Sequence, residues 1–546
     1  MKQLIVLLIF VSIQVQAKTY QLLETKLYSG EVVKKTLTPT GVAVKFLVPS
    51  FEAKSDKSYG IIKDDFQSLK FKGLDNTKEV SKAALPYYSF IVKGVPSDFK
   101  VTLNKGKAFT VKGLKPAPAK ELPCRCAKDK DLNPNIDVLK YEEGRGLYKI
   151  EYLGDFKGVE LSKVTLSPSK YKNGLFEVYP KIEFSIVSKS KNSIDFNIED
   201  LPRDLKSEKN YLIVAASHLV KATNELAEYK RTQGFKVKVV DLKTIGKTSA
   251  KLKTFFHEEY KRNGYNFALL VGHEDTMPTE YIETSSDAQT PSDLKYFTMG
   301  GSTDLIPDVY YGRIVANTAS DVKNQLHKIK EYDQRSYSDS SGTNHFVGIA
   351  SDEGSDPTDV EYMEGFAKEF IDVFKTKTSF FFQESSNSSS RNINKALNTG
   401  ASWLSYIGHG SGTSWSSVNR GDYNTTHIKD LSPGIVKPVI IDVACQNGRF
   451  SYDGRLGERF MNETKNGAAI GAVAYYGGSV DISWHPPAVM ARGINQAIAK
   501  DGVKGLGESL LKGQLYLLAN YDDRAAAEEN LIWYHLFGDP SMNIRF

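Results

Sequence analysis

The sequence predicts an α/β protein whose mostly parallel sheet is flanked by helices and preceded by an all-β domain. From about residue 210 onward, short apolar runs alternate with amphipathic stretches, an order typical of a parallel sheet. Between residues 18 and 205, strand-like runs are separated by frequent turn signals, and helical patterns are scarce. At 546 residues, the chain is long enough for about three domains.

Charge and composition argue against a nucleic-acid-binding protein. The chain has 71 basic and 65 acidic residues, and its formal net charge of +6 is a small excess for this length. Many of the lysines are scattered through the first two hundred residues, without an Arg-rich stripe or interleaved aromatic residues. We therefore expect no nucleic-acid partner.

Residues 1–17 have the pattern of a signal peptide. A short basic start precedes an apolar core from Leu4 to Val11, and the small residues Val15 and Ala17 predict cleavage after Ala17. No later stretch reaches about 18 uninterrupted apolar residues, so we expect no membrane span. The protein is therefore expected to be secreted, either to the extracellular space or to the periplasm.

The three cysteines are an odd number for an exported chain, so at least one thiol is unpaired within the monomer. Cys124 and Cys126 are separated by one residue and could pair only through a strained small ring. Cys445 is then the odd one out. A free thiol in an oxidising compartment is a liability unless it is buried or used.

In the predicted all-β domain, residues 18–205, the clearest strand patterns are Gly41–Val48 and Lys100–Leu103, as in a sandwich or barrel. A Pro- and charge-rich stretch from Pro116 to Pro134 predicts an exposed loop, which carries Cys124, Arg125 and Cys126. Asp200–Lys209 is polar and basic and contains a proline, so it reads as an interdomain linker.

Residues 210–335 form a first α/β unit in this interpretation. The predicted strands are Tyr211–Ala216, Val237–Leu242 and Phe267–Val271, and they alternate with helices over Leu219–Arg231 and Ala250–Arg262. Because these elements alternate regularly, a doubly wound parallel sheet is expected.

Residues 340–546 form a second unit. Phe346–Ser351 is a predicted strand, and Thr358–Glu361 has the form of a capping box before an amphipathic helix. Buried strands are then expected over Trp403–Ile407, Pro438–Ile441 and Ala468–Tyr476.

Two of these strands end in a reactive side chain. His409 follows one strand within a Gly-rich turn, and Cys445 follows another before Asn447 and Gly448. The carboxyl ends of strands are where α/β sheets bind ligands. A thiol needs a nearby base to act as a nucleophile, and the N–H groups of Cys445 and Gly410 could form an oxyanion hole. Taken singly, a core cysteine and a structural histidine are the simpler interpretation.

Three motifs resemble the gingipain family of cysteine peptidases, in the caspase-like clan. They are Tyr406–Ser411, Asp442–Gly448 and the terminal Phe537–Ser541. Leu269–Gly272 and Asp308–Ile314 are similar to the family's first subdomain. The sequence has no counterpart of the family's trailing immunoglobulin-like, adhesin and sorting regions, and we expect a chain without them.

The resemblance implies a caspase-like sheet in two subdomains, residues 210–335 and 340–546, behind an inhibitory prodomain at residues 18–205. It also implies an endopeptidase that acts on proteins or peptides through a Cys445–His409 dyad and a thioester intermediate. No cofactor is required. Calcium that braces acidic loops fits the resemblance, but no EF-hand spacing is present and we assign no ligands.

The same resemblance assigns roles to three further residues. Glu353 would orient His409, although Asp352 is adjacent and could serve instead. Asp359 would form the acidic floor of an S1 pocket that selects Arg or Lys; its alternative role is to complement a helix dipole. Trp484 would be the wall against which the substrate's cationic chain lies, or an ordinary core residue. His427, His485 and His535 are interpreted as structural.

An acidic pocket also suggests how the precursor is kept inactive. We expect Arg125 to enter the pocket and processing to occur there and at Arg203, Lys206 or Lys209, unless these are ordinary solvated charges. Two rival hypotheses remain. One is a caspase-like peptidase with another P1 preference, and the other is a secreted binding module without catalytic activity.

Overall fold

The computed structural model describes residues 17–23, 31–56, 65–120, 124–126, 137, 140–141, 144–190, 192–196, 209–334, 344–354, 357–419 and 421–546. The predicted signal peptide lies outside the described residues except for Ala17, and so do the predicted processing residues Arg203 and Lys206. Among the described helices, none is long and apolar enough to cross a membrane.

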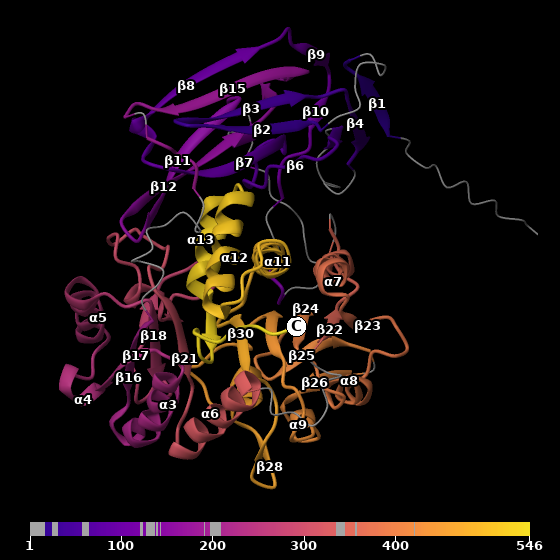
Figure 1. The fold of residues 1–546 in the computed structure, drawn as a ribbon. Helices are drawn as coiled ribbons and strands as arrows, with labels where there is room; N and C mark the ends of the chain where they lie inside the picture. Colours follow the sequence, from indigo (N-terminus) through magenta and orange to yellow (C-terminus); the bar gives the residue numbers. More distant parts are fainter. Residues whose placement is uncertain are drawn as a thin grey trace, which may run out of the picture.

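The N-terminal region is an all-β domain, as predicted, and lies at the top of Figure 1. Within the described residues, its strands form sheets with the orders β2-β3-β15-β8, β11-β12-β7-β6, β1-β4-β5-β10 and β13-β14-β9. The strands are β1 (Lys18–Gln21), β2 (Val33–Thr38), β3 (Gly41–Leu47), β4 (Ser50–Ser55), β5 (Phe66–Lys70), β6 (Asp75–Asn76), β7 (Pro86–Lys93), β8 (Phe99–Lys105), β9 (Phe109–Lys112), β10 (Lys115–Pro116), β11 (Tyr148–Phe156), β12 (Val159–Leu166), β13 (Ser169–Lys172), β14 (Leu175–Val178) and β15 (Lys181–Ser188).

Alternation of side chains builds the core of this domain. In β3, for example, Val42, Val44 and Phe46 are each 1% exposed, while Lys45 between them faces solvent. Successive residues of a strand point to opposite faces, so every second apolar residue enters the core.

The Pro-rich stretch was predicted to be exposed, and for residues 116–119 that prediction is wrong. Pro116 pairs with Gln67 in β5, and Ala117 and Ala119 are 6% and 8% exposed. The Ala117 N–H donates to the Gln67 carbonyl at 2.8 Å and the Ala119 N–H to the Lys82 carbonyl at 2.7 Å. Alternating prolines leave the alanine amides free to pair, so the segment packs like an edge strand.

The C-terminal region is an α/β domain built on one sheet with the order β17-β16-β18-β21-β31-β30-β27-β24-β22-β23. Its strands are β16 (Asn210–Ala215), β17 (Lys236–Asp241), β18 (Phe267–Val271), β21 (Tyr310–Ile314), β22 (His345–Ala350), β23 (Lys377–Phe382), β24 (Trp403–Ile407), β27 (Val439–Val443), β30 (Ala474–Gly478) and β31 (Tyr534–Phe537). The predicted fold class, a mostly parallel sheet flanked by helices, is confirmed. The expected strand over Ala468–Tyr476 is instead split between β30 and a short hairpin strand, β29 (Ala468–Ala469).

Helices and short hairpins cover this sheet. The helices are α3 (Val220–Thr232), α4 (Leu242–Ile245), α5 (Ser249–Asn263), α6 (Ala319–Gln334), α7 (Asp359–Phe374), α8 (Ser390–Leu397), α9 (Thr425–Ile428), α10 (Leu456–Asn462), α11 (Pro486–Ala499), α12 (Leu506–Asn520) and α13 (Arg524–Trp533). The hairpin strands are β19 (Glu280–Ile282), β20 (Thr290–Ser292), β25 (Ser414–Val418), β26 (Gly421–Asn424) and β28 (Thr464–Lys465), which pairs with β29. The predicted capping box is confirmed, since the Thr358 hydroxyl accepts from the Glu361 N–H at 3.2 Å at the start of α7.

The last strand joins the two halves of the sheet. β31 is parallel to β21 and antiparallel to β30, so it links the first four strands to those of the second half. Just beyond it, Asp539 is fully buried, accepts a hydrogen bond from the Tyr211 hydroxyl at 2.8 Å and lies 2.6 Å from Lys230 Nζ. Burial by itself would raise the pKa of Asp539, but Lys230 outweighs it and lowers that pKa overall.

The β domain packs against the α/β domain through polar and apolar contacts. Figure 1 shows α12 and α13 between the sheet and the β domain. At the end of α12, Tyr87 and Ser89 donate to the Asn520 and Ala519 carbonyls, and Arg145 contacts Asp522 at 2.9 Å. Nearby, three apolar side chains of the β domain join the core of the α/β domain: Leu153, Phe156 and Leu161.

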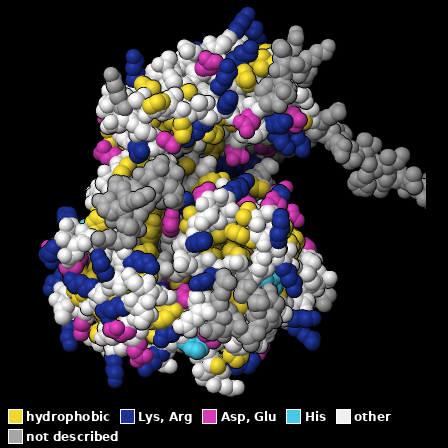
Figure 2. All heavy atoms as spheres, viewed as in Figure 1, with side chains coloured by type: hydrophobic (Ala, Val, Ile, Leu, Met, Phe, Trp, Pro, Cys, Tyr) yellow, Lys and Arg dark blue, Asp and Glu magenta, His cyan; other side chains and the backbone are white. Residues whose placement is uncertain are grey.

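Charged side chains are intermixed over both domains on the face shown in Figure 2. Charge alone therefore does not mark a binding surface on this face. The functional site has to be located from the sheet and its strand ends.

Replacing Asp539 should destabilise the whole α/β domain. In a Cys445→Ala background, Asp539→Ala leaves the buried Lys230 with only the more distant Asp333 carboxylate, 3.8 Å away, which should cost up to about 3–5 kcal/mol of unfolding free energy. Chemical denaturation followed by fluorescence measures the cost. Lys45→Ala is the matched control, because its ion pair with Glu183 is about half exposed and should be worth less than about 1 kcal/mol. Equal effects of the two substitutions would contradict the role of Asp539.

Candidate active site

Four neighbouring parallel strands deliver the candidate site. In the sheet the order is β30-β27-β24-β22, and the carboxyl ends of these strands lead to Trp484, Cys445, His409 and Glu353 respectively. Because parallel strands end at the same edge of the sheet, side chains far apart in the sequence converge there.

The strand register brings Cys445 and His409 into matching positions. Ile407 of β24 pairs with Val443 of β27, and each reactive residue follows two positions later. The 36-residue spacing of His409 and Cys445 therefore equals the register offset between their strands. This is why their matching positions at the strand ends could be predicted from the sequence.

Cys445 sits at a sharp turn. Gln446, the next residue, has a left-handed φ of 60°, a conformation that side chains other than glycine rarely adopt. Gly410 packs on the Cys445 backbone so closely that a Cβ there would lie 2.5 Å from the Cys445 carbonyl oxygen. Only glycine fits, and it brings the Gly410 backbone beside that of Cys445.

The Cys445 thiol is buried, and burial sets its protonation state. Its Sγ accepts a hydrogen bond from the Ile482 N–H at 3.4 Å. Burial, with a smaller contribution from nearby Asp481, raises the pKa of Cys445 to about 12. In this state the sulfur is a protonated thiol at neutral pH and therefore a poor nucleophile.

His409 is held on both sides of its ring. Nε2 lies 2.8 Å from Glu353 Oε2, and Nδ1 contacts the carbonyl oxygen of Arg125. The Trp484 ring packs edge-on against the imidazole, with 5.6 Å between ring centroids. Asp352, the alternative to Glu353, instead accepts from the Glu384 N–H. The geometry thus pairs Glu353, not Asp352, with His409.

Asp359 receives the side chain of Arg125. Arg125 Nη1 and Nη2 donate to the two Asp359 oxygens at 2.7 and 2.9 Å, and both residues are fully buried. Ser351, which the sequence analysis did not single out, also donates to Asp359, at 2.6 Å. Paired carboxylate and guanidinium groups of this kind form one of the strongest polar contacts in proteins.

Trp484 completes the environment of the guanidinium. Arg125 Cζ lies 4.6 Å from the centroid of the Trp484 ring, and its Nε and Nη2 donate to the Trp484 carbonyl at 3.1 and 2.8 Å. Burial alone would lower the pKa of Arg125, but Asp359 raises it overall, so the side chain stays charged.

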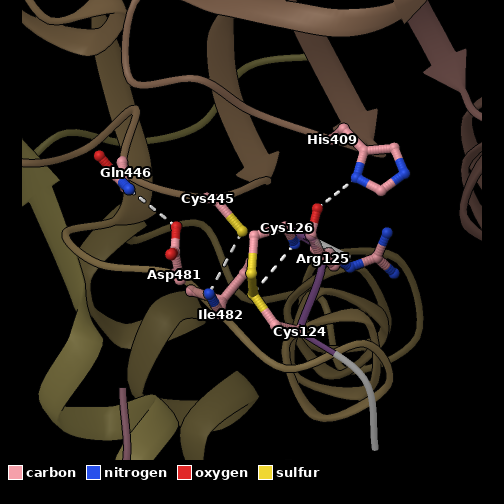
Figure 3. Close-up of a disulfide and its surroundings, with 8 residues drawn as sticks. All are labelled: Cys124, Arg125, Cys126, His409, Cys445, Gln446, Asp481 and Ile482. Carbon is pink, nitrogen blue, oxygen red and sulfur yellow. Dashed lines mark hydrogen bonds between the residues drawn. A yellow bond between two sulfur atoms is a disulfide. The ribbon is translucent and has the colours of Figure 1, made fainter. Parts of the chain in front are cut away.

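The backbone around Arg125 runs alongside the segment after β30. The Arg125 N–H donates to the Ile482 carbonyl at 2.8 Å, and Cys124 forms an antiparallel bridge with Ser483. Cys124 and Cys126 are joined in a disulfide, the pairing that the sequence analysis left open, and Cys445 is the free cysteine. Figure 3 shows this disulfide next to Cys445.

Other predicted residues lie outside this cluster. Lys209 is exposed at the start of β16, where its Nζ donates to the Gln233 carbonyl at 3.1 Å. The three histidines interpreted as structural all have partners within the fold: His427 accepts from the Asn424 N–H, His485 contacts the Tyr362 hydroxyl and His535 the Pro291 carbonyl.

A calcium site is not evident in the described residues. The close group of three possible side-chain ligands there is Cys124, Cys445 and Asp481, whose ligand atoms lie within 4.8 Å of one another. Two of these three atoms are sulfur, whereas calcium takes oxygen ligands. This group therefore does not fit calcium.

Comparison with known proteins places the fold in a class. The model for peptidase family C25 matches residues 204–545. The crystal structure of the Arg-specific cysteine proteinase gingipain R superimposes with a TM-score of 0.56 at 23% identity, covering 62% of this chain and 79% of that one. The complex of Porphyromonas gingivalis RgpB pro- and mature domains gives the same TM-score at 24% identity, covering 61% of this chain and 79% of that one. The fold is thus that of the caspase-like cysteine peptidases.

The chain belongs to peptidase family C25. Gingipain R2 of Porphyromonas gingivalis is 24% identical over 490 residues, which are 82% of this chain and 65% of the relative's length. Lys-gingipain of the same species is 23% identical over 382 residues, or 62% of this chain and 21% of that protein. The chain therefore spans about two thirds or less of the length of these relatives.

The buried carboxyl of Asp442 lies in the strand that leads to the Cys445 turn. Asp442 in β27 accepts hydrogen bonds from the Trp415 indole at 3.0 Å and from the Tyr475 hydroxyl. Burial raises its pKa from 3.8 to about 7. The sequence analysis quoted Asp442 only as part of a motif, since nothing in the local pattern reveals its partners.

This raised pKa predicts a pH dependence of stability. A carboxyl that binds its proton more tightly when folded contributes most at low pH, and the contribution is lost as pH rises from about 4 to about 7. In the Cys445→Ala background, the stability of the parent relative to Asp442→Asn should therefore fall across this window. Urea unfolding at several pH values measures the difference. A difference that is constant with pH would contradict it.

Proposed function

We propose that the protein is a secreted cysteine endopeptidase, made as a latent precursor, that cleaves proteins or peptides after Arg and, less well, Lys. The observation that carries the proposal is the buried Arg125–Asp359 pair, next to the Cys445–His409 pair. A cationic side chain bound beside a thiol and an imidazole is the arrangement that a cysteine peptidase selective for a basic P1 residue needs. The contacts of Arg125 serve as a guide to how a substrate would bind.

In this proposal each residue of the site has a role in peptide hydrolysis. His409 takes the Cys445 proton, and the thiolate attacks the carbonyl carbon after the P1 residue to form a thioester. The backbone N–H groups of Cys445 and Gly410, two residues whose backbones pack closely, stabilise the oxyanion. Glu353 orients the imidazole and stabilises its charged form. His409 then protonates the leaving amine, and water hydrolyses the thioester.

Specificity in this proposal comes from Asp359, Trp484 and Ser351. A guanidinium places two N–H groups on the two carboxylate oxygens and further N–H groups on the Trp484 carbonyl. A lysine ammonium is a point charge and cannot match this fork. Arg is therefore the expected first choice, and neutral side chains would leave Asp359 buried without a partner.

Latency is assigned to the N-terminal β domain, residues 18–205, acting as an intramolecular inhibitor. Its Arg125 occupies the acidic site, and its contact with His409 engages the base. The two α/β halves, residues 210–335 and 340–546, would remain as the mature enzyme. Cleavage at Arg203, Lys206 or Lys209 would release it, and of these Lys209 is exposed in the structure.

The test compares four forms on chromogenic peptides that end in Arg, Lys or Leu. The forms are the precursor, a 210–546 chain and both with Cys445→Ala. Turnover should follow the order Arg, Lys, Leu and vanish without Cys445. Asp359→Asn should lower kcat/KM on the Arg peptide about 100-fold or more, because it removes one side of a buried charge pair. Asp372→Asn, an exposed carboxylate on the same helix, is the matched control.

Three results would count against the proposal. Turnover that survives Cys445→Ala would show that Cys445 is not the nucleophile. Equal turnover of Leu and Arg peptides would favour a peptidase with a different P1 preference. Absence of any turnover, in the precursor and in the 210–546 chain alike, would favour a binding module without catalytic activity.

A further inference from the structure

A disulfide encloses the residue that fills the acidic site. Cys124 and Cys126 are bonded to each other across Arg125, so the ring contains only these three residues. The Sγ atoms of Cys124 and Cys445 lie within 4.8 Å. Neither latency nor catalysis, as described above, uses the disulfide.

Up to Arg125, the segment lies as a substrate would. Cys124 bridges to Ser483, the Arg125 N–H donates to Ile482, and the guanidinium pairs with Asp359. Beyond Arg125 the backbone turns back at once, and the Cys126 N–H donates to Cys124 Sγ at 3.0 Å. The ring therefore prevents the chain from continuing in an extended form past the residue in the acidic site.

The turn also sets the position of the Arg125 carbonyl oxygen. Its oxygen contacts His409 Nδ1, the nitrogen that is not engaged by Glu353 (Figure 3). An imidazole occupied in this way cannot take the thiol proton, and the Cys445 thiol stays protonated. The bond after Arg125 is thus bound next to the nucleophile without being cleaved.

We propose that the Cys124–Cys126 disulfide is a redox lock on latency. While it is oxidised, Arg125 is an inhibitor. When an external thiol reduces it, the segment can extend, the Arg125–Cys126 bond becomes a substrate of Cys445, and latency ends. This proposal rests on the proposed peptidase function.

The reduction is an ordinary thiol–disulfide exchange. Cys126 is exposed and Cys124 is half-buried, so the reductant's thiolate attacks Cys126 Sγ. A bond forms between the reductant sulfur and Cys126, the Cys124–Cys126 bond breaks, and Cys124 leaves as a thiolate that takes up a proton. A second reductant thiol then displaces Cys126. The products are two protein thiols and one reductant disulfide, a two-electron exchange.

Cys445 is not the reductant in this scheme, despite its proximity. A thiol whose pKa is raised to about 12 is almost entirely protonated at neutral pH and reacts slowly with disulfides. The same external thiol also keeps Cys445 reduced. The lock therefore opens under the conditions in which the nucleophile survives.

The experiment uses the full-length precursor and a Cys124→Ser/Cys126→Ser variant, each with and without dithiothreitol. Mass spectrometry follows cleavage of the bond after Arg125, and an Arg-terminated chromogenic peptide reports activity. Alkylation confirms that Cys445 is a free thiol in every sample. The parent should be cleaved at least tenfold faster with reductant, whereas the double-serine variant should be cleaved quickly without it.

A second measurement does not depend on the protein's own activity. In a Cys445→Ala precursor, the Cys126 amide, which donates to Cys124 Sγ while the ring is closed, should exchange its hydrogen at least tenfold faster once the disulfide is reduced. Equal rates in the oxidised and reduced forms would overturn the lock. So would latency that is unchanged in the double-serine variant, or a Cys124–Cys445 crosslink isolated from the unreduced parent.

The two proposals fail in different ways. If the parent and the double-serine variant hydrolyse Arg peptides equally, with and without reductant, only the lock is overturned. If no form hydrolyses any peptide, with reductant or as the 210–546 chain, the peptidase function fails and the lock fails with it.

Discussion

The buried ion pair between Arg125 and Asp359 is the interaction on which the arrangement of the site depends. Both side chains are 0% exposed, and the guanidinium donates two hydrogen bonds to Asp359 and two to the Trp484 carbonyl. Removing one member of such a pair leaves the other charge buried and unpaired, which lowers the unfolding free energy by about 3–5 kcal/mol. Asp359 therefore requires a cation, and in this structure the chain's own β domain supplies it.

The rest of the β domain holds that cation in place by contacts spread over a wide area. Arg145 reaches Asp522 beyond α12, while Phe156 and Leu161 complete the core of the α/β domain. The β domain and the α/β domain therefore share apolar packing as well as polar contacts. In the proposed function, Arg125 gives inhibition its chemical specificity, because it contacts the carboxylate that the substrate's basic side chain would contact.

Much of the site could be predicted because the apolar runs that form strands, and the turn residues that end them, are local properties of the sequence. Cys445 and His409 follow recognisable apolar runs, and the spacing between them equals the register offset of their strands. Glu353 and Asp359 were assigned from a resemblance, and the structure places them against His409 and Arg125. For the same reason, the predicted strands over Tyr211–Ala216, Phe267–Val271 and Trp403–Ile407 agree with the structure to within one residue, whereas the strand expected over Ala468–Tyr476 is split.

What could not be predicted depends on contacts between distant segments. Ser351 and Asp442 are ordinary in sequence, and only the fold reveals that one donates to Asp359 and the other is buried beneath the cysteine turn. The burial of Ala117 and Ala119 depends on pairing with residues far away in the chain. The contact of the Arg125 carbonyl with His409 depends on the turn at Arg125, which the Cys124–Cys126 disulfide closes.

A double-mutant cycle between Arg125 and Asp359 tests the central claim most directly. Unfolding free energies would be measured in the Cys445→Ala precursor for Arg125→Ala, Asp359→Ala and the pair together. If the two side chains stabilise the latent form through each other, the double variant should be less destabilised than the sum of the single ones, with a coupling energy of about 2 kcal/mol or more. Additive effects, with a coupling energy near zero, would contradict the account.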